Sequence, residues 1–130
     1  MTALLLDTNV WLRWTAGEGR ISKRARAAIL ASENRILFSV ASAWEIAIKY
    51  GTGRLSLPAP PSTFVPQQIA QQGFEVLPIL IRHATAVADL PSHHRDPFDR
   101  LLIAQASVDG LTLVTSDATL LTYDVSIIKA

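Results

Sequence analysis

Short apolar runs that end in turn-forming residues recur along the chain and predict buried β-strands. The first is the run 3–6, Ala-Leu-Leu-Leu, which Asp7 ends, and the second is Ile-Leu-Phe-Ser-Val at 36–40. Runs of this length and composition are typical of strands buried on both faces of a sheet. The strands predicted in this way cover residues 3–7, 36–40, 74–79 and 111–115, with a last short strand at 125–128.

Helical patterns fill the gaps between these runs. Apolar residues three and four apart, with capping residues and closing glycines, predict helices over residues 22–33, 42–50, 62–72 and 97–109. The last of these has Pro97 in its first turn and Gly110 just past its end, the asymmetry that helix ends favour. Strands that alternate with helices form a central, mostly parallel sheet with helices on both faces. The predicted fold class is therefore α/β, a three-layer sandwich.

The length and composition indicate one apolar domain, residues 1–130, and exclude a disordered chain. Hydrophobic residues make up 49% of the chain and charged residues 18%, against about 25% in an average domain. So few charges on so small a domain leave apolar surface to be covered, which predicts a homo-oligomer or a tight protein partner. The chain has no cysteine, no leader-like run and nothing near the ~20 apolar residues of a membrane span. We therefore expect a soluble, cytoplasmic protein with no membrane partner.

The charge balance excludes a uniformly basic nucleic-acid-binding protein, because 12 basic and 11 acidic residues leave a net charge of +1. The charges are unevenly distributed, however. The segment from Arg13 to Arg35 holds six basic and two acidic residues, a local balance of +4, and the remainder carries −3. This distribution suits a nuclease with a basic track for a polyanion beside a metal pocket, and it suits a solvated helix face equally well.

Four acidic residues fall where a parallel sheet collects ligands. Asp7 follows the first strand and Asp117 the fourth, while Glu45 and Asp99 lie near the starts of two helices. Ligands of open parallel sheets bind outside the carboxyl ends of the strands, so these side chains are candidates for one pocket. Carboxylates that converge without a basic partner repel one another and need a cation. Hard oxygen ligands without His or Cys favour Mg²⁺, with Mn²⁺ as the alternative.

Each acidic residue also has a purely structural interpretation as a cap. Ser42 and Glu45 have the spacing of a capping box, in which Glu45 would bond back to the Ser42 amide. Asp96, just before Pro97, is placed to cap the next helix, which would leave Asp99 to face the pocket. Asp7 and Asp117 could likewise cap the turns that follow them. The residues alone leave these alternatives open.

Four segments together resemble the PIN domain, and within it the VapC-type toxins of bacterial toxin–antitoxin pairs. They are Leu6-Asp7-Thr8-Asn9, the stretch 39–46 (Ser-Val-Ala-Ser-Ala-Trp-Glu-Ile), the stretch 94–106 around Asp-Pro-Phe-Asp at 96–99, and Leu113-Val114-Thr115-Ser116-Asp117. The resemblance runs from residue 4 to about 128 in the family's order and spacing, and the segment 94–106 is its most specific part. It implies a PIN-like three-layer sandwich.

The resemblance also implies a Mg²⁺-dependent endoribonuclease in which Asp7, Glu45, Asp99 and Asp117 match the family's acidic quartet. Asp7 and Asp99 would bind the metal directly, and Glu45 and Asp117 would act through water or a second ion. The residues that would support the quartet, by orienting the carboxylates or binding phosphate, are Thr8, Asn9, Asp96, Thr115 and Ser116. The implied partners are an RNA substrate, a cognate antitoxin protein and a second copy of the chain.

Three other functions compete with this hypothesis. A phosphatase with an aspartate nucleophile also places an Asp after its first strand, but it needs a second Asp two residues later, where this chain has Asn9. A PIN-like nuclease could process RNA outside toxin–antitoxin systems. A non-catalytic module that binds a partner would use the acidic residues only as caps. Metal-dependent cleavage of RNA separates the nuclease hypotheses from the phosphatase and from the non-catalytic module.

Overall fold

A computed structural model describes residues 2–93 and 95–130. Along the chain the strands are β1 (Ala3–Leu6), β2 (Arg35–Ser39), β3 (Glu75–Leu77), β4 (Thr112–Thr115) and β5 (Ile127–Lys129). The α-helices are α1 (Thr8–Ala16), α2 (Lys23–Leu30), α3 (Val40–Gly51), α4 (Pro61–Gln72), α5 (Ile81–Ala86) and α6 (Pro97–Asp109). Two short 3₁₀ turns, η1 (Val87–Asp89) and η2 (Leu120–Thr122), complete the described elements.

The described strands form one five-stranded sheet in the order β3-β2-β1-β4-β5, and every neighbouring pair is parallel. The prediction of an α/β sandwich on a mostly parallel sheet is confirmed. In the central pairing, Leu6 of β1 lies opposite Val114 of β4. The residues that follow these two strands therefore emerge side by side at the carboxyl edge of the sheet.

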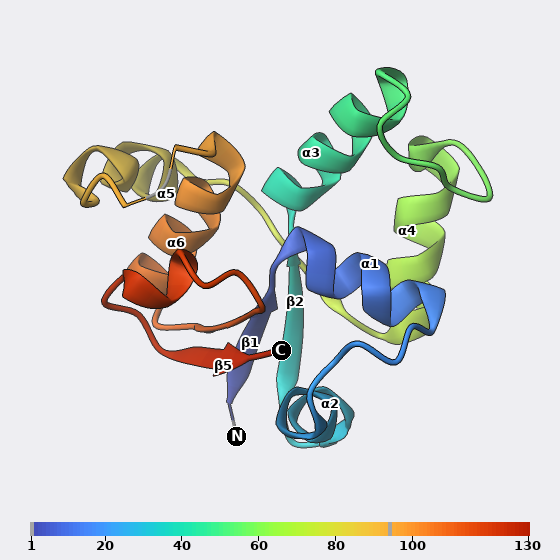
Figure 1. Cartoon of the computed structure of the whole chain (residues 1–130), viewed down its shortest axis with the longest axis horizontal. Coiled ribbons are helices and arrows are strands. Elements are labelled where there is room, and N and C mark those ends of the chain that lie inside the picture. The colour runs from blue at the N-terminus through green and yellow to red at the C-terminus, as the bar shows by residue number, and fades with distance from the viewer. Residues whose placement is uncertain (1, 94) are drawn as a thin grey trace.

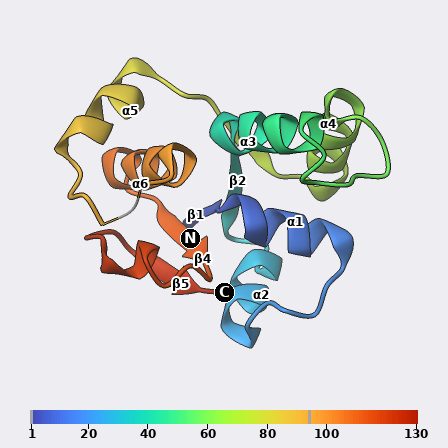
Figure 2. The same cartoon turned by 45° about the horizontal axis from the view of Figure 1, so that its top comes forward.

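The sheet separates two apolar cores, because successive side chains of a strand point to opposite faces. On one face Leu4 and Leu6 pack with residues of α1, α2, α3 and α4, including the fully buried Trp11. On the other face Leu5 packs with Leu102 and other residues of α6. Figure 1 shows α5 and α6 on one side of the strands, α1 and α4 on the other, and α2 below them, and Figure 2 shows the same layers from a raised viewpoint.

The predicted elements are all present with shifted ends, and α1 is a further helix that the four predicted helical ranges do not include. The helix predicted over 97–109 has those bounds in the structure, whereas α3 begins at Val40, two residues before the predicted start. The segment 81–89, for which no helix was predicted, forms α5 and η1. Its first residue, Ile81, is 83% exposed, so the amphipathic pattern that would reveal a helix is weak there. No helix in the described part of the chain is both long and apolar enough to cross a membrane.

Candidate metal and nuclease site

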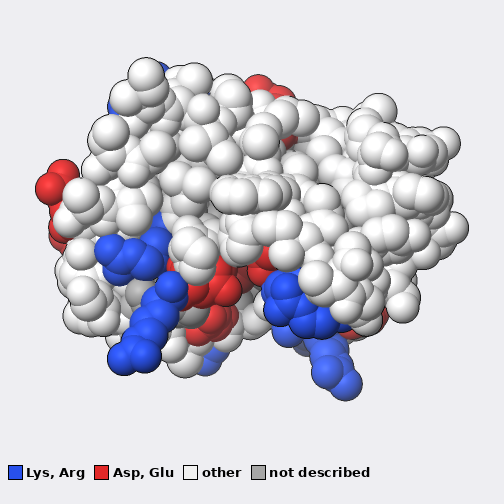
Figure 3. Space-filling model, turned by 90° about the horizontal axis from the view of Figure 1, so that it is seen from above, with Lys and Arg blue, Asp and Glu red and all other residues white. Residues whose placement is uncertain are grey.

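The four predicted acidic residues lie together in one cavity of about 260 Å³ at the carboxyl edge of the sheet. The cavity also contains four of the predicted supporting residues and one basic side chain. Its lining consists of Asp7, Thr8, Asn9, Glu45, Lys49, Asp96, Asp99, Ser116 and Asp117. Figure 3, a view onto this edge, shows acidic side chains gathered in one area with basic side chains on either side. Thr115, the remaining predicted residue, is fully buried behind the cavity.

Asp7 links β1 to α1 and is only 4% exposed. Its Oδ1 accepts a hydrogen bond from the Val10 amide (2.7 Å), so the side chain caps α1, and its Oδ2 accepts one from the Thr115 hydroxyl. Burial raises the pKa of Asp7 above its ordinary 3.8, and the nearby charge of Asp117 raises it further. The hydrogen bonds from Thr115 and Val10 and the charge of Arg13 oppose this rise. Asp7 thus caps α1 and also faces the cavity as a desolvated carboxylate. Its interpretation as a cap and its interpretation as a site residue are therefore compatible.

Glu45 is held by two side chains, one from α1 and one from its own helix. The Thr8 hydroxyl donates to Glu45 Oε1 (2.7 Å) and lies 2.8 Å from the Ser42 hydroxyl. The Lys49 ammonium donates to Glu45 Oε2 at 2.6 Å. Both carboxylate oxygens of a residue that is 4% exposed therefore have a donor.

The capping-box interpretation of Ser42 and Glu45 is wrong, because the helix starts earlier. The cap of α3 is Ser39, whose hydroxyl accepts from the Ala41 amide at 3.0 Å. This places Ser42 inside the first turn, where it is buried against Thr8. Glu45 then lies a turn further on and points to Thr8 and Lys49.

The two acidic residues at the start of α6 divide their roles in the way the sequence predicts. Asp96 caps the helix, since its Oδ1 accepts from the amides of Phe98 (2.9 Å) and Asp99 (3.2 Å). Asp99 lies in the first turn, and both residues border the cavity. His94, which belongs to the same segment of the family resemblance, lies outside the described residues.

The loop after β4 supplies Ser116 and Asp117. The Thr115 hydroxyl, which donates to Asp7, also accepts from the Asp117 amide at 3.1 Å. Asp117 Oδ1 in turn accepts from the Thr119 amide (2.8 Å), as expected of a residue that caps the following turn. Ser116 Oγ accepts from Arg13 Nη1 at 2.9 Å, which brings a guanidinium of α1 to the rim of the cavity. Thr115 thus fixes both Asp7 and the backbone that presents Asp117.

The donor set suits a hard divalent cation, because five carboxylates and several hydroxyl and amide oxygens share one small cavity with one ammonium group. Within residues 2–93 and 95–130, no three His, Cys, Asp or Glu side chains are already arranged around a single point as ligands of one ion. The lining residues therefore provide suitable ligand chemistry for a metal ion. Their side-chain positions are those of the protein chain alone.

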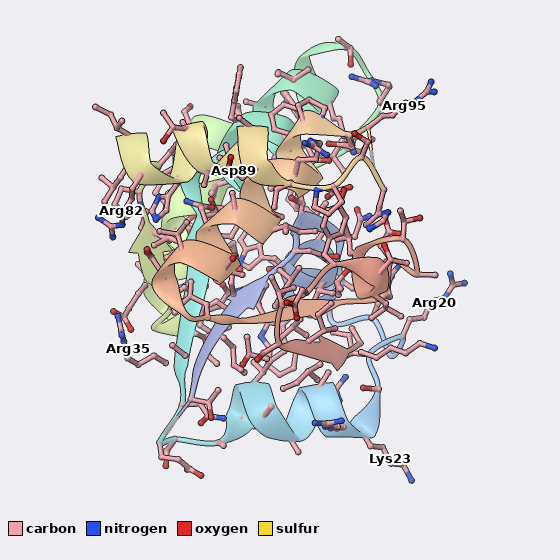
Figure 4. The ribbon with its side chains drawn as sticks, turned by 90° about the vertical axis from the view of Figure 1, so that its left-hand side faces the viewer. Arg20, Lys23, Arg35, Arg82, Asp89 and Arg95 are labelled. Carbon is pink, nitrogen blue, oxygen red and sulfur yellow. The ribbon has the colours of Figure 1, made fainter. Side chains whose placement is uncertain are left out.

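Lys49 and Arg35 form ion pairs that the sequence patterns did not predict. The spacing of Glu45 and Lys49, four residues apart on one helix, was the signal for their ion pair. Arg35, by contrast, forms a two-pronged ion pair with Glu75 at the opposite end of the sheet. In Figure 4, Lys23 lies at the bottom of the molecule and Arg95 at the top. Within the segment 13–35, Lys23 and Arg35 therefore lie away from the cavity, whereas Arg13 reaches its rim.

Comparison with known proteins identifies the family. The PIN domain family matches residues 4–125. The chain is 35% identical to Ribonuclease VapC22 of Mycobacterium tuberculosis over 117 residues, which are 90% of this chain and 88% of the relative. It is 42% identical to Ribonuclease VapC16 of the same organism over 59 residues, which are 45% of this chain but only 40% of that protein.

Solved structures agree in fold. A chain in the crystal structure of VapBC2 from Rickettsia felis, bound to a DNA fragment from their promoter, superimposes with a TM-score of 0.75 at 15% identity, covering 99% of each chain. A chain of a toxin–antitoxin complex from Klebsiella pneumoniae gives a TM-score of 0.66 at 16% identity, with 97% of this chain and 96% of that chain covered. Together with the sequence match along most of its length, these findings show that the chain belongs to the PIN-domain family and, within it, to the VapC ribonucleases.

Proposed function

We propose that this VapC-family ribonuclease cleaves RNA internally, with Mg²⁺ or Mn²⁺ as its cofactor, and that it is the toxin of a toxin–antitoxin pair in the cytoplasm. The observation that carries the proposal is the convergence of Asp7, Glu45, Asp99 and Asp117 in one cavity. PIN nucleases are typically metal-dependent, and four carboxylates from separate elements need a cation when they share so small a volume.

Asp7 and Asp99 would hold the metal directly, while Glu45 and Asp117 would act through water or a second ion. Bound there, the metal would lower the pKa of a coordinated water and neutralise charge that develops on the phosphate. The chain's own residues prepare this chemistry. Thr115 orients Asp7, and Thr8 and Lys49 orient Glu45. The side-chain orientation of both carboxylates is therefore set before the reaction begins.

A cognate antitoxin and a second copy of the chain are the proposed protein partners. The antitoxin is supported by the VapBC2 and toxin–antitoxin complexes that share this fold. The homodimer is supported by large apolar side chains that the described chain leaves exposed on α3 and around β3 and α5. These are Val40, Trp44, Val76, Leu80 and Ile81, which are 38–83% exposed. Covering such a surface is the usual reason for a small apolar domain to associate.

Cleavage of RNA by the purified chain tests the proposal. We expect an RNA to be cut in Mg²⁺ or Mn²⁺, to stay intact in EDTA, and to stay intact with well-folded Asp99→Asn. Lys23→Gln, which removes a charge far from the cavity, serves as the control and should cleave like the parent. A parent protein that binds metal but leaves every RNA intact would favour a non-catalytic module, and cleavage that persists in EDTA would contradict the metal mechanism.

A further inference from the structure

A second and larger cavity lies next to the acidic one. Its volume is about 600 Å³, and it is bounded by α1, by the connection between α3 and α4, and by α4. Asn9 borders both cavities. Arg13 lines the larger cavity and donates from Nη1 to Ser116, which lines the acidic one. A ligand that occupies both cavities would therefore cross the Arg13 guanidinium.

The lining of the larger cavity suits an uncharged, flat group with a polar edge. Its apolar walls come from Leu12, Leu57 and Phe64, and polar side chains such as Thr15 and Gln68 interrupt them. Besides Arg13, its only charged lining residue in the described chain is Glu18, which would repel a phosphate. A nucleobase meets these conditions, since it has an apolar face and hydrogen-bonding edges and carries no charge.

We propose that this cavity binds the base of the nucleotide next to the cleaved bond, with Arg13 contacting the phosphate between the two cavities. The proposal rests on the proposed ribonuclease function and adds a binding subsite to it. Charge separation supports this arrangement. The scissile phosphate requires the carboxylates and their cation, a neighbouring phosphate is matched by the guanidinium, and the base has a mostly uncharged cavity of its own.

The subsite predicts a dependence on one base position that can be measured by binding. A short fluorescent oligoribonucleotide is compared with a series in which each nucleotide in turn carries no base, and binding is followed by anisotropy. At one position the loss of the base should weaken binding to the parent roughly 5- to 150-fold, the range for one stacked base. Mapping of the cut in Mg²⁺ should then place that position beside the cleaved bond.

A pair of variants on α4 assigns the effect to the cavity. Gln68→Trp fills the cavity, whereas Gln67→Trp makes the same change at an exposed neighbour that is not part of its lining. Gln67→Trp should reproduce the parent's abasic series. Gln68→Trp should bind the intact oligonucleotide more weakly and lose the dependence on that one base, with kcat little changed and KM raised. Thermal melts confirm that both variants fold.

Three results would decide against the subsite. If no abasic position affects binding to the parent, the cavity holds no base. If Gln68→Trp gives the same series as Gln67→Trp, the cavity belongs to another ligand, such as an antitoxin helix, and the proposal is wrong. If the sensitive position lies far from the mapped cut, the two cavities do not act on neighbouring nucleotides. Failure of the ribonuclease function itself would look different, because RNA would then stay uncut in both Mg²⁺ and Mn²⁺.

Discussion

Replacement of Asp7 by Asn should stabilise the metal-free protein at pH 7 and abolish its activity. Asn can keep the cap of α1, because its side-chain oxygen can accept from the Val10 amide as Asp7 Oδ1 does. The Thr115 hydroxyl can turn to accept from the new amide group instead of donating to Asp7 Oδ2. The main change is therefore the removal of a charge from a site that is 4% exposed.

The size of the gain follows from the raised pKa of Asp7. An acid whose pKa is raised on folding contributes stability below its unfolded pKa, and this contribution is lost as the pH rises through the folded pKa. Each pKa unit corresponds to about 1.4 kcal/mol, so with a starting value of 3.8 the loss at pH 7 cannot exceed about 4 kcal/mol. Hydrogen bonds and the charge of Arg13 oppose the effect of burial, so the gain expected for Asp7→Asn lies below this limit.

Thermal melts in EDTA between pH 4 and pH 7 measure this difference. The two proteins should differ least at pH 4, and Asp7→Asn should gain on the parent as the pH rises, by about 3–5 °C per kcal/mol in a domain of this size. Mn²⁺ at a hundred times its dissociation constant should add about 2.7 kcal/mol to the parent and little to the variant. If Asp7→Asn melts well below the parent at pH 7 in EDTA, the charge of Asp7 stabilises the fold and the reasoning is wrong.

Further substitutions separate the remaining roles. Asp99→Asn should abolish cleavage with the fold intact. Asp96→Ala removes the cap of α6, so it should lose about 0.5–2 kcal/mol of stability yet keep part of the activity. Complete loss of metal binding by Asp96→Ala at an unchanged Tm would make Asp96 a ligand. Lys49→Gln leaves the buried carboxylate of Glu45 without its ammonium partner, so it should lose about 1–3 kcal/mol of stability in EDTA and be stabilised more by Mg²⁺ than the parent is. Equal melting temperatures of variant and parent in both conditions would contradict this. Ile81→Glu should convert a sedimenting dimer to a monomer, while Leu30→Glu, at a residue 65% exposed on another helix, should not; a dimer that survives Ile81→Glu places the interface elsewhere.

Local patterns were sufficient to predict the fold class, because its main features are recorded in short stretches of chain. Three leucines directly before Asp7 are typical of a strand with both faces covered, and Pro97 with Gly110 marks the ends of α6 without reference to the rest of the molecule. The helix α5 is different. It is six residues long and buries His83, which bonds through Nδ1 to the Leu80 amide and through Nε2 to Asp109 of α6. Its formation depends on that distant carboxylate, which no local pattern reveals.

The grouping of the four acidic residues was predictable from topology, since parallel strands end at the same edge whatever the details of packing. The identity of their neighbours was not. Lys49 could be assigned to RNA or to solvent from the sequence, and only the fold shows that its ammonium lies in the acidic cavity against Glu45. This pairing has a consequence for the site. With both oxygens of Glu45 already bound by Thr8 and Lys49, direct metal coordination by Glu45 would require one of these contacts to break.

The start of α3 shows why one residue of the site was assigned the wrong role. Ser39 and Ser42 both have the chemistry of a helix cap, and local preference does not distinguish them. The choice is made by Gln105 of α6, whose Oε1 accepts from the Ser39 hydroxyl at 2.5 Å while its Nε2 donates to the Pro78 carbonyl. A side chain 66 positions away in sequence thus holds Ser39 at the end of β2, where its oxygen can also accept from the Ala41 amide. Once the helix begins there, Ser42 is buried against Thr8, and Glu45 faces the cavity instead of its own helix terminus. The buried Gln105 is therefore a determinant of the acidic site, although it does not line the cavity.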